Sequence, residues 1–294
     1  MSDTPQGTAD SIARVRLPHP ERLFEARARR LVELSGDHPA APFLALLARV
    51  ARGQHRAVRS VTVPPGAHLL EGRPLDHARW RLDGAWREML RAVLDSAADG
   101  PLPEAAAAVI AHLGDAPAHE LDALAARVLD GSCTDLAAAP FVGAALQAYF
   151  SRLAGGLDER AVSPGGEGCP VCGAGPVAGV VLGDQRLRYL TCALCATEWY
   201  VPRVLCAVCS STSAVSYFSV DEAYPGVSAE ACDDCGLYVK LFDLERAIGA
   251  EPAADDAATL VLDLLVAERG YHRAGGNLIA PSGGAGEHAH ERDS

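Results

Sequence analysis

The sequence predicts an α+β protein, with an N-terminal all-α domain followed by two small β modules in tandem and a C-terminal helix. Three observations predict this fold class. Apolar residues recur at helical spacing over the first half, short β-type runs replace them after about residue 165, and eight of nine cysteines form C-x-x-C pairs there. A chain of 294 residues, 49% of them hydrophobic, is long enough to bury more than one structural unit.

Residues 21–160 are expected to form the helical domain. In "PFLALLARV", Phe43, Leu46, Leu47 and Val50 fall at i, i+3, i+4 and i+7, which places them on one helix face. Two further segments repeat this spacing: Leu82, Trp86, Met89, Leu90 and Val93, and Val142, Leu146, Tyr149, Phe150 and Leu153. Weaker helices are expected near 21–35, 104–113 and 119–130, between Pro and Gly breaks. Residues 1–20 are polar and contain proline, so a flexible arm is expected there.

A change in composition at "AVSPGGEG", residues 161–168, marks the domain boundary. Beyond it, the runs "VAGVVL", "LRYLTC", "AVSYFSV" and "LYVKLF" are typical of short strands. The first module is expected over 165–203 and the second over 204–247. One amphipathic helix is expected over 255–272, and the polar end, 273–294, is expected to be disordered.

The cysteines carry the strongest signal for function. The four pairs are Cys169 and Cys172, Cys192 and Cys195, Cys206 and Cys209, and Cys232 and Cys235. A tetrahedral metal needs four convergent thiolates at about 2.3 Å, and each C-x-x-C supplies two from one tight turn. About twenty residues separate the pairs within each half, enough for two strands and a turn. The spacing therefore predicts two metal ions per chain, each bound by four cysteines in a rubredoxin-like or zinc-ribbon module.

A weak internal repeat favours sequential pairing of the cysteines, while a cross-braced arrangement of first with third and second with fourth pairs stays open. Gly173 and Gly236 follow two of the pairs, where glycine tolerates positive φ. "CALCA" and "CAVCS" lack this glycine, so each site is expected to contain one standard and one less usual knuckle. The ligands do not separate iron from zinc. Cys133 has no thiol partner nearby in the sequence.

Charge and motifs exclude several classes of function. The formal net charge is -12, and residues 165–246 contain five Lys or Arg against ten Asp or Glu, which argues against a nucleic-acid-binding ribbon. No apolar run reaches the roughly 18 residues of a membrane span, so no membrane insertion is expected. Closely paired thiols and the lack of a secretory signal favour the cytoplasm. The sequence lacks the G-x-G-x-x-G, P-loop, H-E-x-x-H and G-x-S-x-G motifs, so a binding protein is expected, not an enzyme.

A rigid knuckle flanked by aromatic residues and arginine is a candidate surface for a partner. The candidate partner-binding residues surround the second pair: Arg188, Tyr189, Thr197, Glu198, Trp199 and Tyr200. The alternative is that Trp199 and Tyr200 pack the small core of the module.

Four segments together resemble a known family. They are "RARRLVELSGDHPAAPFLALLARVARGQ", "CPVCG", "RYLTCALCATEWYVPRVLCAVC" and "EACDDCGLYVK". They are similar to the formate dehydrogenase accessory proteins, the FdhE family, and the likeness covers residues 20–270. All eight paired cysteines match the family's motif positions, so the resemblance implies that each is a metal ligand.

The resemblance also implies a function. It suggests a cytoplasmic protein needed for the maturation of formate dehydrogenase, which binds the catalytic subunit of that molybdenum or tungsten enzyme and holds iron in its cysteine sites. The alternative is an electron-transfer protein of the rubredoxin type, whose iron would give visible absorbance that bleaches on reduction. A homodimer is compatible with either expectation.

Overall fold

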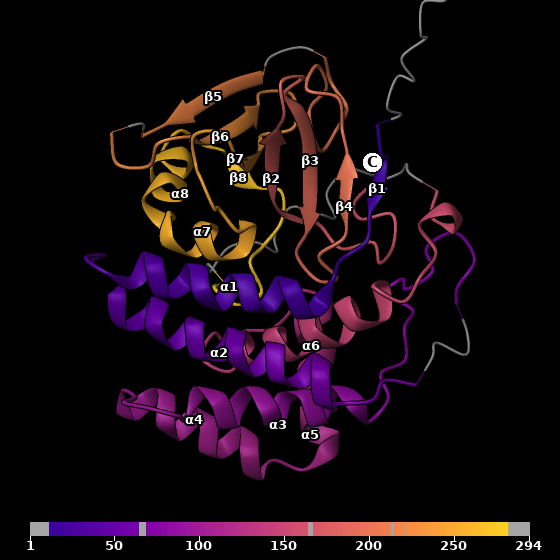
Figure 1. The fold of residues 1–294 in the computed structure, drawn as a ribbon, viewed down its shortest axis with the longest axis vertical. Helices are drawn as coiled ribbons and strands as arrows, with labels where there is room; N and C mark the ends of the chain where they lie inside the picture. The colour runs from indigo at the N-terminus through magenta and orange to yellow at the C-terminus, as the bar shows by residue number, and fades with distance from the viewer. Residues whose placement is uncertain (1–11, 65–68, 164–166, 213–214, 221, 282–294) are drawn as a thin grey trace, which may run out of the picture.

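The structure is a computed structural model that describes residues 12–64, 69–163, 167–212, 215–220 and 222–281. Six helices form one layer, and a sheet flanked by two further helices forms the other (Figure 1). The helices of the first layer are α1 (Pro20–Ser35), α2 (Ala41–Ser60), α3 (Ala85–Ala97), α4 (Glu104–Asp115), α5 (Ala118–Leu129) and α6 (Ala139–Ala154). A 3-10 turn, Glu159–Ala161, precedes the sheet layer. This confirms the predicted fold class.

Helix α6 is the centre of the helical layer. Almost all of its side chains are buried, including Leu146 and Phe150, because it packs against α2, α3 and α5 as well as the sheet layer. Helix α2 buries Leu44 and Leu47 but leaves Phe43 36% exposed. Its buried face is therefore rotated from the predicted one, because α2 packs against α1 and α3 on two sides.

The two β modules share one sheet, in the order β1-β4-β3-β2-β7-β6-β5, with β8 beside β7. The strands are β1 (Val15–Arg16), β2 (Pro176–Leu182), β3 (Leu187–Cys192), β4 (Glu198–Tyr200), β5 (Val215–Ser219), β6 (Val227–Cys232), β7 (Leu237–Asp243) and β8 (His272–Arg273). Parallel pairing of β2 with β7 joins the modules, with Gly179 opposite Leu241. A Cβ at Gly179 would lie 2.7 Å from Leu241 Cδ2, so a larger residue there would displace the Leu241 side chain.

Two described segments near the ends, 12–20 and 273–281, are more ordered than the sequence predicted. Val15, in the segment expected to be a flexible arm, is buried and pairs with Trp199 through β1. In the segment expected to be disordered, Asn277 and Ile279 are buried, and Asn277 Nδ2 donates to the carbonyl oxygen of Ala253. These contacts correct the prediction for 12–20 and 273–281, whereas 1–11 and 282–294 lie outside the described residues.

The expected closing helix forms two helices, α7 (Pro252–Ala258) and α8 (Leu260–Ala267), which separate at Thr259. Lys240 is fully buried beneath this break, and its Nζ donates to the carbonyl oxygens of Asp256 and Thr259 at 3.0 and 3.1 Å. Asp256 and Asp263 neutralise the ammonium at 3.1 and 2.6 Å. The buried charge therefore has partners that only a broken helix can supply.

Candidate metal centres

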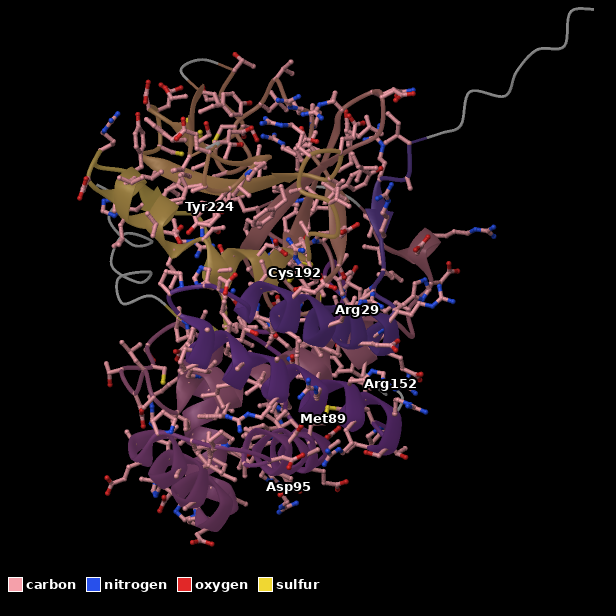
Figure 2. The ribbon with its side chains drawn as sticks, turned by 60° about the vertical axis from the view of Figure 1, so that its left-hand side comes forward. Arg29, Met89, Asp95, Arg152, Cys192 and Tyr224 are labelled. Atoms are coloured by element: carbon pink, nitrogen blue, oxygen red, sulfur yellow. The ribbon has the colours of Figure 1, made fainter. Side chains whose placement is uncertain are left out.

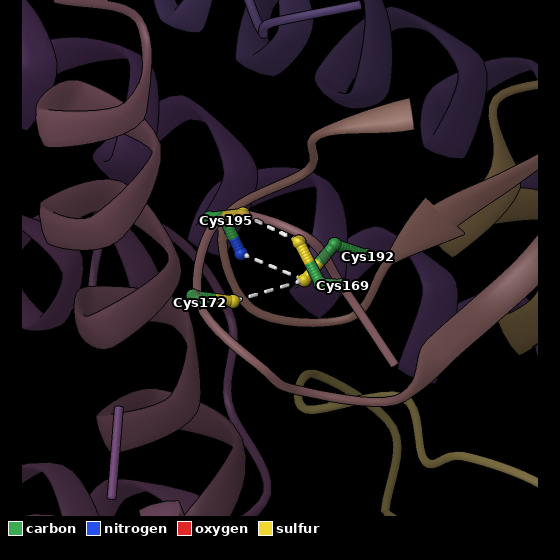
Figure 3. A group of neighbouring side chains, drawn as sticks. All are labelled: Cys169, Cys172, Cys192 and Cys195. Atoms are coloured by element: carbon green, nitrogen blue, oxygen red, sulfur yellow. Dashed lines mark hydrogen bonds between the residues drawn. The ribbon is translucent and has the colours of Figure 1, made fainter. Parts of the chain in front are cut away.

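The first four-cysteine group lies between the helical layer and the sheet. Its members are Cys169, Cys172, Cys192 and Cys195, and Figure 3 shows their sulfur atoms turned toward one another. The Sγ atoms of Cys169 and Cys195 are 3.5 Å apart, and those of Cys172 and Cys192 are 3.4 Å apart. A tetrahedron with metal–sulfur bonds of about 2.3 Å has edges of about 3.8 Å. All four side chains are buried, so the first centre is closed to solvent.

The second group lies within the C-terminal module. Its members are Cys206, Cys209, Cys232 and Cys235, with Sγ separations of 3.9 Å between Cys206 and Cys235 and 3.7 Å between Cys209 and Cys232. These separations also fit one tetrahedral ion. The structure pairs the cysteines sequentially, as the repeat favoured, and the cross-braced arrangement is absent from it. Cys209 is exposed and Cys235 is half-buried, so the second centre is open on one side.

All four knuckles have the same backbone geometry. The residue after the second cysteine has positive φ in each: 82° at Gly173, 58° at Ala196, 60° at Ser210 and 70° at Gly236. This turn allows backbone N–H groups to point at sulfur, as Val171 N does to Cys169 at 3.4 Å. The missing glycines therefore did not change the turn, but Ala196 and Ser210 adopt a conformation that costs an L-residue about 1 kcal/mol or more.

The electrostatics of the first centre favour a bound cation. Burial raises the pKa of the Cys172 thiol well above its ordinary value, and the pKa of Cys192 is raised for the same reason. Burial acts on Cys169 too, but hydrogen bonds from Cys172, Cys192 and Cys195 outweigh it and hold the pKa of Cys169 well below the ordinary range. Burial therefore opposes the ionisation of Cys172 and Cys192, and a bound divalent or trivalent metal would offset it.

The helical layer holds the first centre directly. Leu75 N and His77 N, from the segment between α2 and α3, donate to the carbonyl oxygens of Val171 and Cys172, each at 2.9 Å. From α6, Gln147 Nε2 donates at 2.7 Å to the carbonyl oxygen of Ala193, inside the second knuckle. Figure 2 shows Cys192 at the boundary between the layers. Both knuckles of the first centre are thus tied to elements more than 45 residues away.

Gln147 is itself held by a buried polar network. Its Oε1 accepts from Arg27 Nη1 and from Gln54 Nε2, each at 3.0 Å. Arg27 also forms a buried ion pair with Glu251 at 2.8 Å. No sequence pattern predicted this network, because its members come from α1, α2, α6 and the residue before α7, and no local spacing relates them.

Most of the candidate partner-binding residues face inward. Arg188 is fully buried, forms an ion pair with Glu230, and donates to the carbonyl oxygens of Pro202 and Leu205 at 2.8 and 2.7 Å. It thereby fixes the linker between the two modules. Tyr189 and Thr197 are also fully buried.

The remaining three candidates lie on β4. Trp199 is buried between β1 and β3, whereas Glu198 and Tyr200 are half-buried. Intramolecular contacts occupy these positions: Tyr189 and Tyr200 meet edge to face, and Glu198 lies 3.6 Å from Arg16. The role of the six residues in binding a partner stays a prediction. Cys133 is half-buried, and its Sγ lies 3.7 Å from the carbonyl oxygen of Asp135, outside both four-cysteine groups.

The fold and these two centres define a protein in which a helical domain carries two tandem four-cysteine modules able to hold metal ions. Family models match this arrangement in three consecutive parts: FdhE, N-terminal, over 12–167; FdhE, central domain, over 168–203; and FdhE, C-terminal domain, over 204–280. The chain therefore belongs to the FdhE family.

Individual relatives agree with this assignment. "Protein FdhE homolog" of Cronobacter sakazakii is 36% identical over 284 residues, and the match covers 91% of each chain. "Protein FdhE" of Escherichia coli O127:H6 is 35% identical over 291 residues, with 93% of each chain covered. The crystal structure of the FdhE protein from Pseudomonas aeruginosa superposes with a TM-score of 0.81 at 33% identity, and covers 92% of this chain and all of that one. None of the described helices is long and apolar enough to cross a membrane.

Proposed function

We propose that this chain is a non-catalytic accessory protein that acts in the cytoplasm during the maturation of a formate dehydrogenase, by binding its catalytic subunit. The observation that carries the proposal is the combination of FdhE family models from residue 12 to 280 with two complete four-cysteine groups. The conclusion that the chain is not an enzyme rests on the same family membership, since the relatives carry the name FdhE.

Each four-cysteine group in this proposal binds one iron or zinc ion. The sulfur separations of the first centre fit either metal, and either cation would offset the burial that raises the pKa of Cys172. Four thiolates leave no coordination position for water or substrate, so a bound zinc ion would stabilise the fold, and a bound iron ion could also exchange one electron. The cysteines, the N–H groups aimed at them and the helical layer supply the geometry.

Copurification tests the proposed client. The tagged catalytic subunit of a formate dehydrogenase and the untagged chain are produced together without oxygen, and the chain should elute with the tag. An unrelated tagged molybdoenzyme subunit is the control. Equal recovery on both tags, or none on either, would contradict the proposal. Light scattering on the same material distinguishes a homodimer from a monomer.

The proposed docking residues can be tested in the same experiment. Glu198→Arg and Tyr200→Ala change the two half-buried candidates and should lower recovery on the tag. Arg188, Tyr189, Thr197 and Trp199 are unsuitable for this test, since their substitution would disturb the buried core of the module. Full recovery with both variants would exclude Glu198 and Tyr200 from the interface.

Electron transfer is the second candidate function, and the exposure of Cys209 favours it. An iron ion at the second centre would lie close to solvent, where a redox partner can approach. Protein purified without oxygen should then absorb visible light and bleach on reduction in proportion to its iron content. Colourless protein that contains two zinc ions would rule this function out.

A further inference from the structure

Helix α2 has an unusual distribution of charge. Its 20 residues include Arg49, Arg52, Arg56 and Arg59, and His55, but no acidic residue, in a chain of formal net charge -12. The four arginines are spaced by three, four and three positions, so they lie along one face of the helix. This face points away from the core, since Arg52, Arg56 and Arg59 are exposed.

Arg49 and Arg52 line depressions between α2 and its neighbours, and Arg52, Arg56 and Arg59 line a shallow one on α2 itself. Three adjoining depressions have volumes of about 520, 440 and 390 Å³. The first and second share Val32 and Arg52 in their linings, and the second and third share Arg52 and His55. We call this the α1/α2 groove and define it by Val32, Arg49, Arg52, His55, Arg56 and Arg59. Helices α1 and α2 lie side by side in Figure 1, and Figure 2 shows Arg29 on the α1 side.

The floor of the groove is apolar. Val32 is 47% exposed there, and Ala28, Ala45, Ala48 and Leu102 line it on both sides. A ligand that covered Val32 would remove apolar surface from water, and carboxylates on the same ligand could pair with the adjacent arginines. The combination favours a ligand with an apolar stripe flanked by negative charge.

The cations of the groove are largely unneutralised. Within the part of the chain that the structure describes, Arg52 and Arg56 make no ion pair. Arg59 forms a long ion pair, in which its Nε lies 3.9 Å from a carboxylate oxygen of Glu21. Arg49 donates from Nη2 to the carbonyl oxygen of Pro101, but its Nε and Nη1 have no partner among the described residues. The linings of the three depressions contain five arginines but only three acidic residues, Glu25, Glu33 and Asp99. Glu33 already forms an ion pair with Arg30 at 3.4 Å.

We propose that the α1/α2 groove binds an acidic amphipathic helix of a partner protein. Arg49 to Arg59 span about 15 Å along α2, which matches about ten residues of a helix. Carboxylates at i, i+3 and i+7 of that helix would meet Arg52, Arg56 and Arg59, while its apolar stripe covers Val32. A nucleic acid fits less well, because the chain as a whole repels a polyanion and the floor offers no aromatic surface for base stacking.

The test uses the full chain and a fluorescein-labelled helical peptide of about 15 residues with glutamates on one face and leucines beside them. Fluorescence anisotropy should show binding that weakens as salt is raised. The same peptide with lysine in place of glutamate should not bind. Arg52→Glu combined with Arg56→Glu should weaken binding at least about tenfold, since two ion pairs become repulsive contacts.

The matched control is Arg79→Glu combined with Arg127→Glu, which makes the same change of charge at exposed arginines outside the groove. It should leave the affinity within about twofold. Thermal unfolding of both double variants shows that the fold is retained. The proposal is overturned if the acidic peptide does not bind, if both double variants weaken it equally, or if an oligothymidine of equal charge binds as tightly as the peptide.

Discussion

The two candidate metal centres have the same ligands and the same knuckle turns but different surroundings. The first is buried between the helical layer and the sheet, and hydrogen bonds from the segment around His77 and from Gln147 hold both of its knuckles. The second leaves Cys209 exposed and Cys235 half-buried. A C-x-x-C pattern therefore fixes how sulfur atoms converge, whereas the packing around them decides whether a metal is enclosed or accessible.

This difference predicts different roles for the metals in the two centres. A metal in the first centre would stabilise the contact between the two layers, because the knuckles that hold it are also the contact surface. A metal in the second centre would stabilise only its own module, and it could exchange with solvent or a partner. Four experiments test this difference between the two centres.

Removing one cysteine ligand from each centre should change metal content and stability the most. Cys192→Ala and Cys232→Ala should each lower the metal content by one equivalent per chain, measured by elemental analysis of anaerobically purified protein. The free energy of unfolding should fall by several kcal/mol for Cys192→Ala, because a structural tetrathiolate site contributes on the order of 10 kcal/mol to folding. The loss should be smaller for Cys232→Ala. Two full equivalents in either variant would show that the substituted cysteine is not a ligand.

Metal release should also separate the centres. The second centre should lose its metal to a coloured chelator at least about tenfold faster than the first, since the chelator can approach Cys209 without any opening of the fold. The Cys232→Ala variant assigns the two phases, because the fast phase should disappear in it. Two equal rates would contradict the contrast between an enclosed and an open centre.

The sequence predicted the features that depend on local spacing. Both four-cysteine groups, their sequential pairing and the helical domain follow from residues close together in the chain. It missed the features that depend on distant contacts. The parallel pairing of β2 with β7 merges the two modules into one sheet, and Arg188, expected at a surface, is buried against Glu230 instead.

The ends of the chain illustrate the same limit. Residues 12–20 and 273–281 are polar or rich in glycine and proline, so their composition suggests disorder. Their order comes from single contacts, such as Val15 on β4 and Asn277 beneath α7. Composition cannot reveal such contacts, because each one needs a partner far away in the sequence.

The third experiment tests whether α6 steadies the first centre. Gln147→Leu removes the hydrogen bond to the carbonyl oxygen of Ala193 and leaves Arg27 and Gln54 with fewer partners. We expect a loss of about 1–3 kcal/mol in the free energy of unfolding, as for other buried polar groups left unsatisfied. Metal release from the first centre should accelerate, while release from the second should not change.

Gln54→Leu is the matched control for Gln147→Leu. It alters the same buried network and leaves the hydrogen bond to the knuckle in place. It should therefore lower stability without changing metal release from the first centre. Equal acceleration by both variants would assign the effect to general loosening of the core, not to Gln147.

The smallest effect concerns the two knuckles that lack glycine. Ala196 and Ser210 have φ values of 58° and 60°, so Ala196→Gly and Ser210→Gly should each relieve backbone strain. The gain should be about 0.5–1 kcal/mol after the greater freedom of glycine in the unfolded chain is subtracted. For Ala196→Gly, in the enclosed centre, this gain in stability should be measurable by thermal unfolding of the whole protein.

The effect of Ser210→Gly should appear mainly as slower metal release from the open centre. Gly236→Ala is the converse control, since a Cβ there meets no atom within 4 Å and only the positive φ of 70° opposes the change. It should accelerate metal release from the second centre. If Ser210→Gly and Gly236→Ala shift that rate in the same direction, the knuckle turn does not control it, and the contrast between the centres must arise from solvent access alone.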